Sequence, residues 1–111
     1  MSEKSESNAE AFVVLSTCPP QQAGELAHKL VEKRLAACVN IVKELASVYR
    51  WQGKIHEDPE SLLVIKTSRA RIGELTDEIV ALHPYAVPAV VALPVERGYE
   101  QYLRWIVEET T

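Results

Sequence analysis

Residues 48–67, with the sequence VYRWQGKIHEDPESLLVIKT, contain the pattern that decides the fold. Gln52-Gly53 predicts a tight turn between two β-strands, because glycine tolerates the positive φ that such turns require. The strand after the turn is expected from Ile55 to about Thr67, and Pro59 within it marks a bulge or a sheet edge. The strand before the turn is expected to begin with Cys38 to Val42 and to resume through Val48 to Trp51. Together they predict a long β-hairpin.

The elements on either side of this hairpin complete a recognisable order. In chain order they are a strand over 11–16, a helix from 19 or 20 to 35, a helix from 68 or 69 to 82, a strand over 87–95 and a short helix over 99–109. The result is β-α-β-β-α-β with a C-terminal helix, the ferredoxin-like sandwich of the α+β class. Right-handed crossovers place both main helices on one face of a four-stranded sheet.

Three of these strands do not alternate apolar and polar residues, as 12–15 (FVVL), 62–65 (LLVI) and 90–93 (VVAL) show. A sheet with one face in water should alternate, so both faces are expected to be buried although the two main helices cover only one. Burying a Val or Leu side chain contributes about 1.5–3 kcal/mol, which favours self-association. The alternative is that the C-terminal helix covers the second face. In the assembly, the hairpin is expected to act as an arm that pairs between subunits.

Composition narrows the class of protein. The chain has 111 residues, 47% hydrophobic and 25% charged, which fits one globular domain over 11–111 behind a polar, disordered tail over 1–10. A formal charge of −4, without a basic run, argues against nucleic acid and against anionic membranes. No apolar run is long enough to insert into a bilayer. Two cysteines give no disulfide framework, so a reduced, cytoplasmic setting is expected.

The predicted topology brings distant residues to one end of the sheet. The end of the first strand, the segment after the second main helix and the hairpin all meet there, so Cys18 and His83 are candidate neighbours. A thiolate and an imidazole suit copper or zinc, and they also suit a nucleophile–base pair. The structural alternatives are a buried packing role for Cys18 and a structural hydrogen bond for His83.

Four further residues are candidates for a ligand cleft. Lys66 ends an apolar strand and is a candidate anchor for an anionic ligand, with a salt bridge at the sheet rim as the alternative. Tyr49, Trp51 and Tyr85 are candidates to line a cleft between subunits, with simple packing as the alternative. The sequence has no Gly-rich phosphate loop, serine nucleophile elbow or paired-carboxylate motif. We therefore do not expect an enzyme.

Several motifs carry a family resemblance. They are LAACVN (35–40), SVYRWQGKI (47–55), IKT (65–67), HPY (83–85) and ALPV (92–95), and in this order they resemble the CutA divalent-cation tolerance proteins. The resemblance covers roughly residues 11–107. It implies a stable ferredoxin-like homotrimer with interlocked hairpins, a cleft between subunits, and a cytoplasmic role in tolerance of divalent cations, copper above all. It also implies a likeness in shape to PII signalling proteins.

The resemblance also points to a metal site. Bacterial members are proposed to hold copper with a cysteine on the first strand and two adjacent histidines after the second helix. Here the first of these positions is Ser16, only His83 of the pair is present, and Cys18 is the candidate substitute. Ala89 stands where the family has a carboxylate. We expect weak binding of copper or another divalent cation near His83. The alternatives are a PII-like sensor of a small molecule or anion, or a trimeric scaffold that anchors another, unknown protein.

Overall fold

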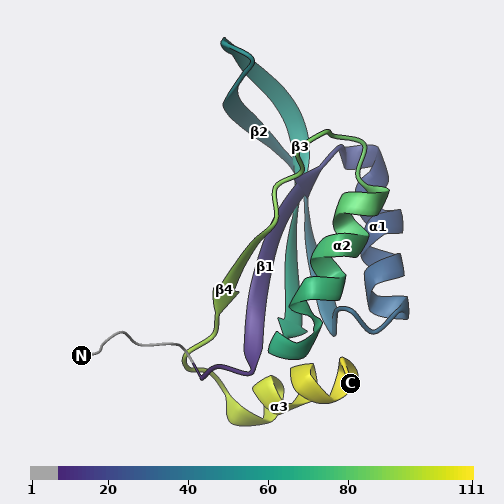
Figure 1. Ribbon diagram of the computed structural model, residues 1–111, viewed down its shortest axis with the longest axis vertical. Helices are drawn as coiled ribbons and strands as arrows, with labels where there is room; N and C mark the ends of the chain where they lie inside the picture. The colour runs from purple at the N-terminus through teal and green to yellow at the C-terminus, as the bar shows by residue number, and fades with distance from the viewer. Residues whose placement is uncertain (1–7) are drawn as a thin grey trace, which may run out of the picture.

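The predicted order of elements is confirmed by the computed structural model, which describes residues 8–111 (Figure 1). The strands are β1 (Ala11–Cys18), β2 (Cys38–Trp51), β3 (Lys54–Ser68) and β4 (Val91–Pro94), and the helices are α1 (Ala23–Glu32), α2 (Ile72–Leu82) and α3 (Glu100–Glu109), with 3-10 turns at Pro20–Gln22 and Arg69–Arg71. The sheet order is β2-β3-β1-β4, with antiparallel pairing throughout. This is the α+β, ferredoxin-like sheet that the sequence predicts.

The hairpin projects beyond the rest of the sheet, as predicted (Figure 1). β1 pairs only with residues 61–68 of β3, so the part of β3 before them pairs with β2 alone. Pro59 lies in that projecting part, where β3 has no neighbouring strand on its β1 side. The missing N–H of the proline therefore costs no hydrogen bond between strands there. The turn has φ of 52° at Gln52 and 80° at Gly53, the positive values expected of it. The interruption expected after Val42 is a shift of register between Val42 and Leu45, within one continuous strand.

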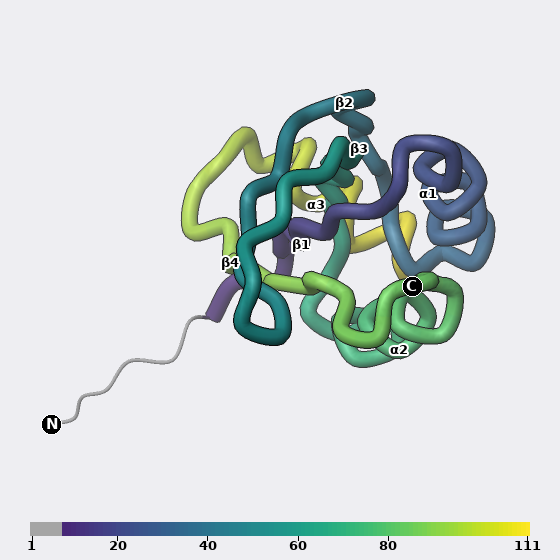
Figure 2. Tube along the Cα trace, turned by 90° about the horizontal axis from the view of Figure 1, so that it is seen from above, coloured from purple at the N-terminus to yellow at the C-terminus, as the bar shows by residue number. Residues whose placement is uncertain are grey.

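One face of the sheet carries the core. Figure 2, seen from above, places α1 and α2 together on one side of the strands. Alternate residues of β1, such as Val14 and Cys18, and of β3, such as Leu63 and Ile65, are 0% exposed and pack beneath these helices. α3 crosses one end of the sheet (Figure 1), where the buried hydroxyl of Thr110 donates to Ser68 Oγ at 2.8 Å.

The opposite face is left uncovered along β4 and the outer part of β2. Leu15 pairs with Val91 and Val13 with Leu93, so these side chains share the face away from the helices. Val91 is 53% exposed and Leu93 is 46% exposed. α3 lies at one end of the sheet and leaves them open, so the alternative in which it alone covers this face is wrong.

Several boundaries differ from expectation. The first strand continues to Cys18 instead of ending at 16, and the first helix ends at Glu32 instead of 35, before the positive φ of 60° at Arg34. The strand expected over 87–95 is paired only at Val91–Pro94. Pro88 has no N–H to donate, and the preceding residues follow the rim of a pocket instead of β1. The tail expected over 1–10 lies, for residues 1–7, outside the described part of the chain. The carbonyls of Ala9 and Glu10 accept hydrogen bonds from Arg69 at 2.9 and 2.8 Å.

Candidate functional site

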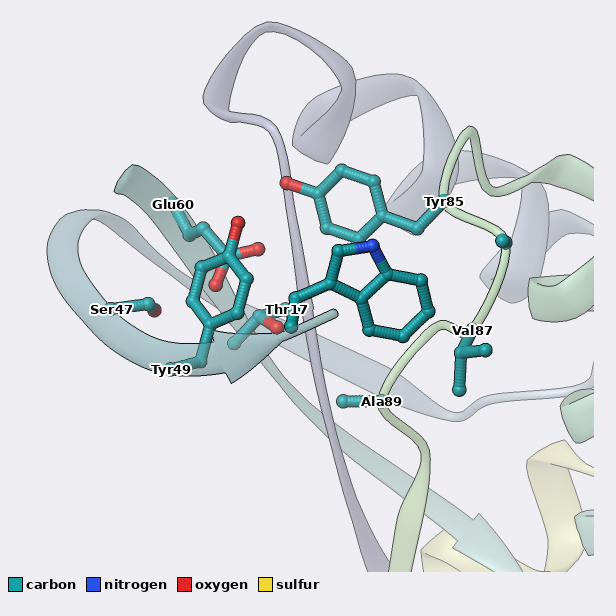
Figure 3. Close-up of a pocket in the computed structure, with 9 residues that line it drawn as sticks. Thr17, Ser47, Tyr49, Glu60, Tyr85, Val87 and Ala89 are labelled. Atoms are coloured by element: carbon teal, nitrogen blue, oxygen red, sulfur yellow. The ribbon is translucent and has the colours of Figure 1, made fainter. Parts of the chain in front are cut away.

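A pocket of about 480 Å³ lies where the hairpin leaves the sheet. Its walls come from three parts of the chain: the end of β1, the projecting hairpin from Glu60 at its base to Trp51 beside the turn, and the segment between α2 and β4 (Figure 3). The lining residues are Thr17, Ser47, Tyr49, Trp51, Glu60, Tyr85, Ala86, Val87 and Ala89. This volume suits a small organic ligand. The predicted convergence of these segments is therefore confirmed.

His83 fastens the segment after α2 to the end of β1. Its backbone is extended, with ψ of 139°, which ends the helix and turns the chain toward the pocket. Its Nδ1 accepts the backbone N–H of Tyr85 at 3.1 Å, so Nε2 carries the proton and donates to the Thr17 carbonyl at 2.7 Å. The side chain is 8% exposed. His83 thereby positions Tyr85, whose ring centroid lies 4.6 Å from the imidazole.

Glu60 is the charged residue of the pocket lining. It lies on β3 on the same face as Thr17, and it is only 6% exposed. Figure 3 shows the Tyr85 hydroxyl directed toward the Glu60 carboxylate. Burial, followed by a hydrogen bond to Glu60 and by its negative charge, raises the pKa of Tyr85 to about 12. The Tyr85 side chain is therefore a neutral hydrogen-bond donor at physiological pH.

Tyr49 forms another aromatic wall. It stacks on His56 across the hairpin, with ring centroids 5.4 Å apart. Its hydroxyl donates a hydrogen bond to the Asp58 carboxylate, which is the main reason why the pKa of Tyr49 is raised. The stacking and the hydrogen bond together fix the orientation of the Tyr49 ring in the pocket wall.

The metal ligands suggested by the sequence are not open to a metal in this geometry. Cys18 is the neighbour of Thr17, as the predicted topology requires, but its side chain is 0% exposed in the core. Burial, and secondarily Glu60, raise the pKa of the Cys18 thiol, which disfavours the thiolate that binds metals. Ser16 shares this buried face, and its Oγ has no hydrogen-bond partner. Among residues 8–111, no three His, Cys, Asp or Glu side chains gather to hold a metal ion.

The candidate cleft residues divide into two groups. Tyr49, Trp51 and Tyr85 all line the pocket. Lys66 does not, because it lies further along β3, opposite Val13 and Cys38, where its ammonium donates to the Asn40 side chain. Within the pocket lining there is no basic residue. Within one chain, the three aromatic candidates therefore lie together in the pocket, and Lys66, the candidate anchor for an anion, lies outside it.

Sequence reasoning missed Glu60 and Thr17 as lining residues. A signal for Glu60 was present, because it stands two positions before Leu62 and four before Val64, and alternate residues of a strand share a face. That spacing places the carboxylate on the face away from the helices. The sequence could not show that the segment after α2 covers this position.

The sheet order, the two crossover helices and a pocket at the base of a projecting hairpin define a small ferredoxin-like protein of the α+β class. The family model described as CutA1 divalent ion tolerance protein matches residues 12–109. The chain therefore belongs to the CutA1 divalent ion tolerance family, as the motifs predicted.

Individual relatives agree with this assignment. The chain is 52% identical over 99 residues to the divalent-cation tolerance protein CutA of Thermus thermophilus, covering 88% of this chain and 96% of that one. It is 50% identical over 101 residues to human protein CutA, where it covers 90% of this chain but 55% of the longer relative. The chain thus spans little more than half the length of that relative.

Solved structures show the same fold. The Thermus thermophilus divalent cation tolerance protein superposes with a TM-score of 0.88 at 50% identity, covering 91% of this chain and 99% of that one. The PII-like protein CutA from Nostoc superposes with a TM-score of 0.86 at 31% identity, covering 90% and 97%. Other relatives are named for different compartments, since an Arabidopsis thaliana protein is called chloroplastic and an Archaeoglobus fulgidus structure periplasmic. In the described part of this chain, none of the helices has the length and apolar character needed to span a membrane.

Proposed function

We propose that the chain is a non-enzymatic divalent-cation tolerance protein that works as a homotrimer in the cytoplasm. The observation that carries the assembly is the uncovered apolar sheet face, on which Val42 and Leu93 are each 46% exposed and Val91 is 53% exposed. Exposed β-branched and leucine side chains on one face favour a protein partner over water. A second copy of the same chain offers the matching apolar surface, and the resemblance to CutA implies three copies.

Binding of copper or another divalent cation near His83 is proposed to be weak. Both ring nitrogens of His83 are engaged, one by the Thr17 carbonyl and one by the Tyr85 N–H. A metal must replace one of these hydrogen bonds, and Cys18 stays in the core. The net gain is therefore small compared with a preformed site of three or four ligands.

Two measurements test this function. Size-exclusion chromatography with light scattering should give about three times the chain mass of 12.4 kDa. Calorimetric titration with copper(II) should show weak binding that His83→Ala removes and His28→Ala leaves intact, because the exposed His28 bonds only within its own helix. A stable monomer contradicts the assembly, and unchanged copper binding in His83→Ala removes His83 from the metal site.

A second function, sensing of a small molecule, is favoured by the pocket itself. The cavity lies in the region that the sequence predicted for a ligand cleft, and three of the four proposed cleft residues line it. The anion form of this hypothesis loses support because Lys66 bonds to Asn40 outside the pocket. A ligand-shift screen on thermal unfolding tests the sensor function, and the absence of any hit across nucleotides, carboxylates and amines counts against it.

A further inference from the structure

Glu60 is a buried carboxyl group in the pocket lining. Glu60 is only 6% exposed, yet it forms no ion pair with Lys, Arg or His within residues 8–111. A buried carboxylate is costly unless it is paired or well hydrogen-bonded. The Tyr85 hydroxyl supplies a neutral donor but no positive charge. The pocket therefore holds an acidic group without a basic partner and has room for a positively charged ligand beside it.

The walls around this carboxylate are aromatic. Tyr49, Trp51 and Tyr85 come from two separate segments of the chain and line one cavity, and each is about two-fifths exposed. In Figure 3 the rings of Tyr49 and Tyr85 stand near the Glu60 carboxylate. The faces of aromatic rings attract cations, and the attraction is strongest for poorly hydrated ones. Ala86, Val87 and Ala89 add apolar surface on the remaining side.

The chemistry of this lining selects among cations. A bare divalent metal ion prefers several charged or strongly donating ligands, but the lining offers one carboxylate, and its other side-chain oxygens are the neutral hydroxyls of Thr17, Ser47, Tyr49 and Tyr85. An alkylated ammonium group needs no ligand set, because its methyl groups contact the rings while its charge faces the carboxylate. A cavity of about 480 Å³ also has room for the rest of a small organic molecule.

We propose that this pocket binds an organic cation with an alkylated ammonium group, with Glu60 as its counter-ion and Tyr49, Trp51 and Tyr85 as its aromatic walls. The proposal rests on the small-molecule function of the pocket and is independent of copper binding at His83. It replaces the expected anionic ligand with a cationic one. The competing occupant is a Lys or Arg side chain of a second copy of this chain.

The test is calorimetric titration of the assembled protein with choline chloride and with its neutral isostere, 3,3-dimethylbutan-1-ol, in which a carbon atom replaces the quaternary nitrogen. The cation should bind about tenfold more tightly than the alcohol, as expected for one charge pair with cation–π contacts. Glu60→Gln should lower the affinity for the cation about tenfold and leave the affinity for the alcohol unchanged. Glu57→Gln is the matched control, because Glu57 lies on the opposite face of the same strand, across from Val48.

Trp51→Leu separates the aromatic contribution from simple burial. Leucine keeps the wall apolar but has no aromatic ring. The affinity for the cation should therefore fall severalfold, while the affinity for the alcohol should be nearly unaffected. Light scattering and thermal unfolding of every variant verify that assembly and fold persist. Because each substitution is compared between two ligands on the same sample, partial loss of fold cannot mimic the expected result.

The outcomes are distinct. Equal affinity for the cation and the alcohol overturns the organic-cation proposal but leaves an apolar ligand pocket in place. Binding of neither compound overturns both the proposal and the sensor function. Failure to bind the cation, together with loss of assembly in Glu60→Gln but not in Glu57→Gln, shows that a basic residue of a second copy neutralises Glu60, and this also overturns the proposal.

Discussion

Val91→Asp should dissociate the assembly without unfolding the chain. Val91 lies on β4, pairs with Leu15 on the face away from the helices, and is 53% exposed in the single chain. The next residue of β4 on that face, Leu93, is also uncovered. An aspartate at this position therefore remains in water in the monomer and is desolvated only when copies associate.

The magnitude follows from the exposed half of the side chain. Full burial of Val contributes about 1.5–3 kcal/mol, so covering the exposed 53% contributes about 0.8–1.6 kcal/mol per copy, or about 2.5–5 kcal/mol for three copies. Val91→Asp loses this contribution and adds the penalty of burying three unpaired carboxylates, several kcal/mol each. Val91→Thr keeps the β-branched shape and replaces only one methyl group with a hydroxyl group. It therefore loses part of the apolar contribution without adding a charge, and the variant should still assemble.

The assay is light scattering over a dilution series, with circular dichroism to follow the fold. Val80→Asp is the matched control, because Val80 is 51% exposed but lies on α2, on the other side of the sheet. We expect Val91→Asp to give a folded monomer, whereas Val80→Asp and Val91→Thr keep the wild-type mass. An undiminished assembly in Val91→Asp would refute the inference that copies of the chain cover this face.

Three further predictions concern the core and the titrating groups. Leu63→Ala should lower the free energy of unfolding by about 2–5 kcal/mol in chemical denaturation, because this 0% exposed side chain leaves a cavity under the helices; a loss well under 1 kcal/mol (about the cost of a surface change) would show that the core repacks freely. The Tyr85 pKa of about 12, above its ordinary value of 10.0, means that the folded protein holds this proton more tightly than the unfolded chain, so its contribution to stability is intact below pH 10.0 and is lost as the pH rises toward 12. Alkaline titration followed by phenolate absorbance should lose its last component in Tyr85→Phe, and an unchanged curve would contradict the burial beside Glu60. The Cys18 thiol, buried and with a raised pKa, should resist thiol reagents in Cys38→Ser protein until denaturant is added, whereas rapid labelling of the native protein would place Cys18 outside the core.

Sequence by itself determined the order of the elements and the exposed apolar face. Turn residues such as Gln52-Gly53 and helix-spaced apolar residues act within a few positions of the chain, so they can be interpreted without knowing the fold. The non-alternating runs, such as Leu62 to Ile65, likewise required that both faces of a strand be apolar. Topology then sufficed to predict that the residues around His83 meet the end of the first strand.

Only the tertiary structure decided which side chains lie together in the core and which lie together in the pocket. The direction of Cys18 depends on β1 continuing to that residue, which puts its thiol in the core, while Thr17 faces the pocket. The pairing register that places Glu60 beneath Tyr85, and Lys66 away from both, joins residues far apart in the chain. Such long-range register is set by the packing of the whole sheet, because a shift of one residue moves every side chain to the opposite face.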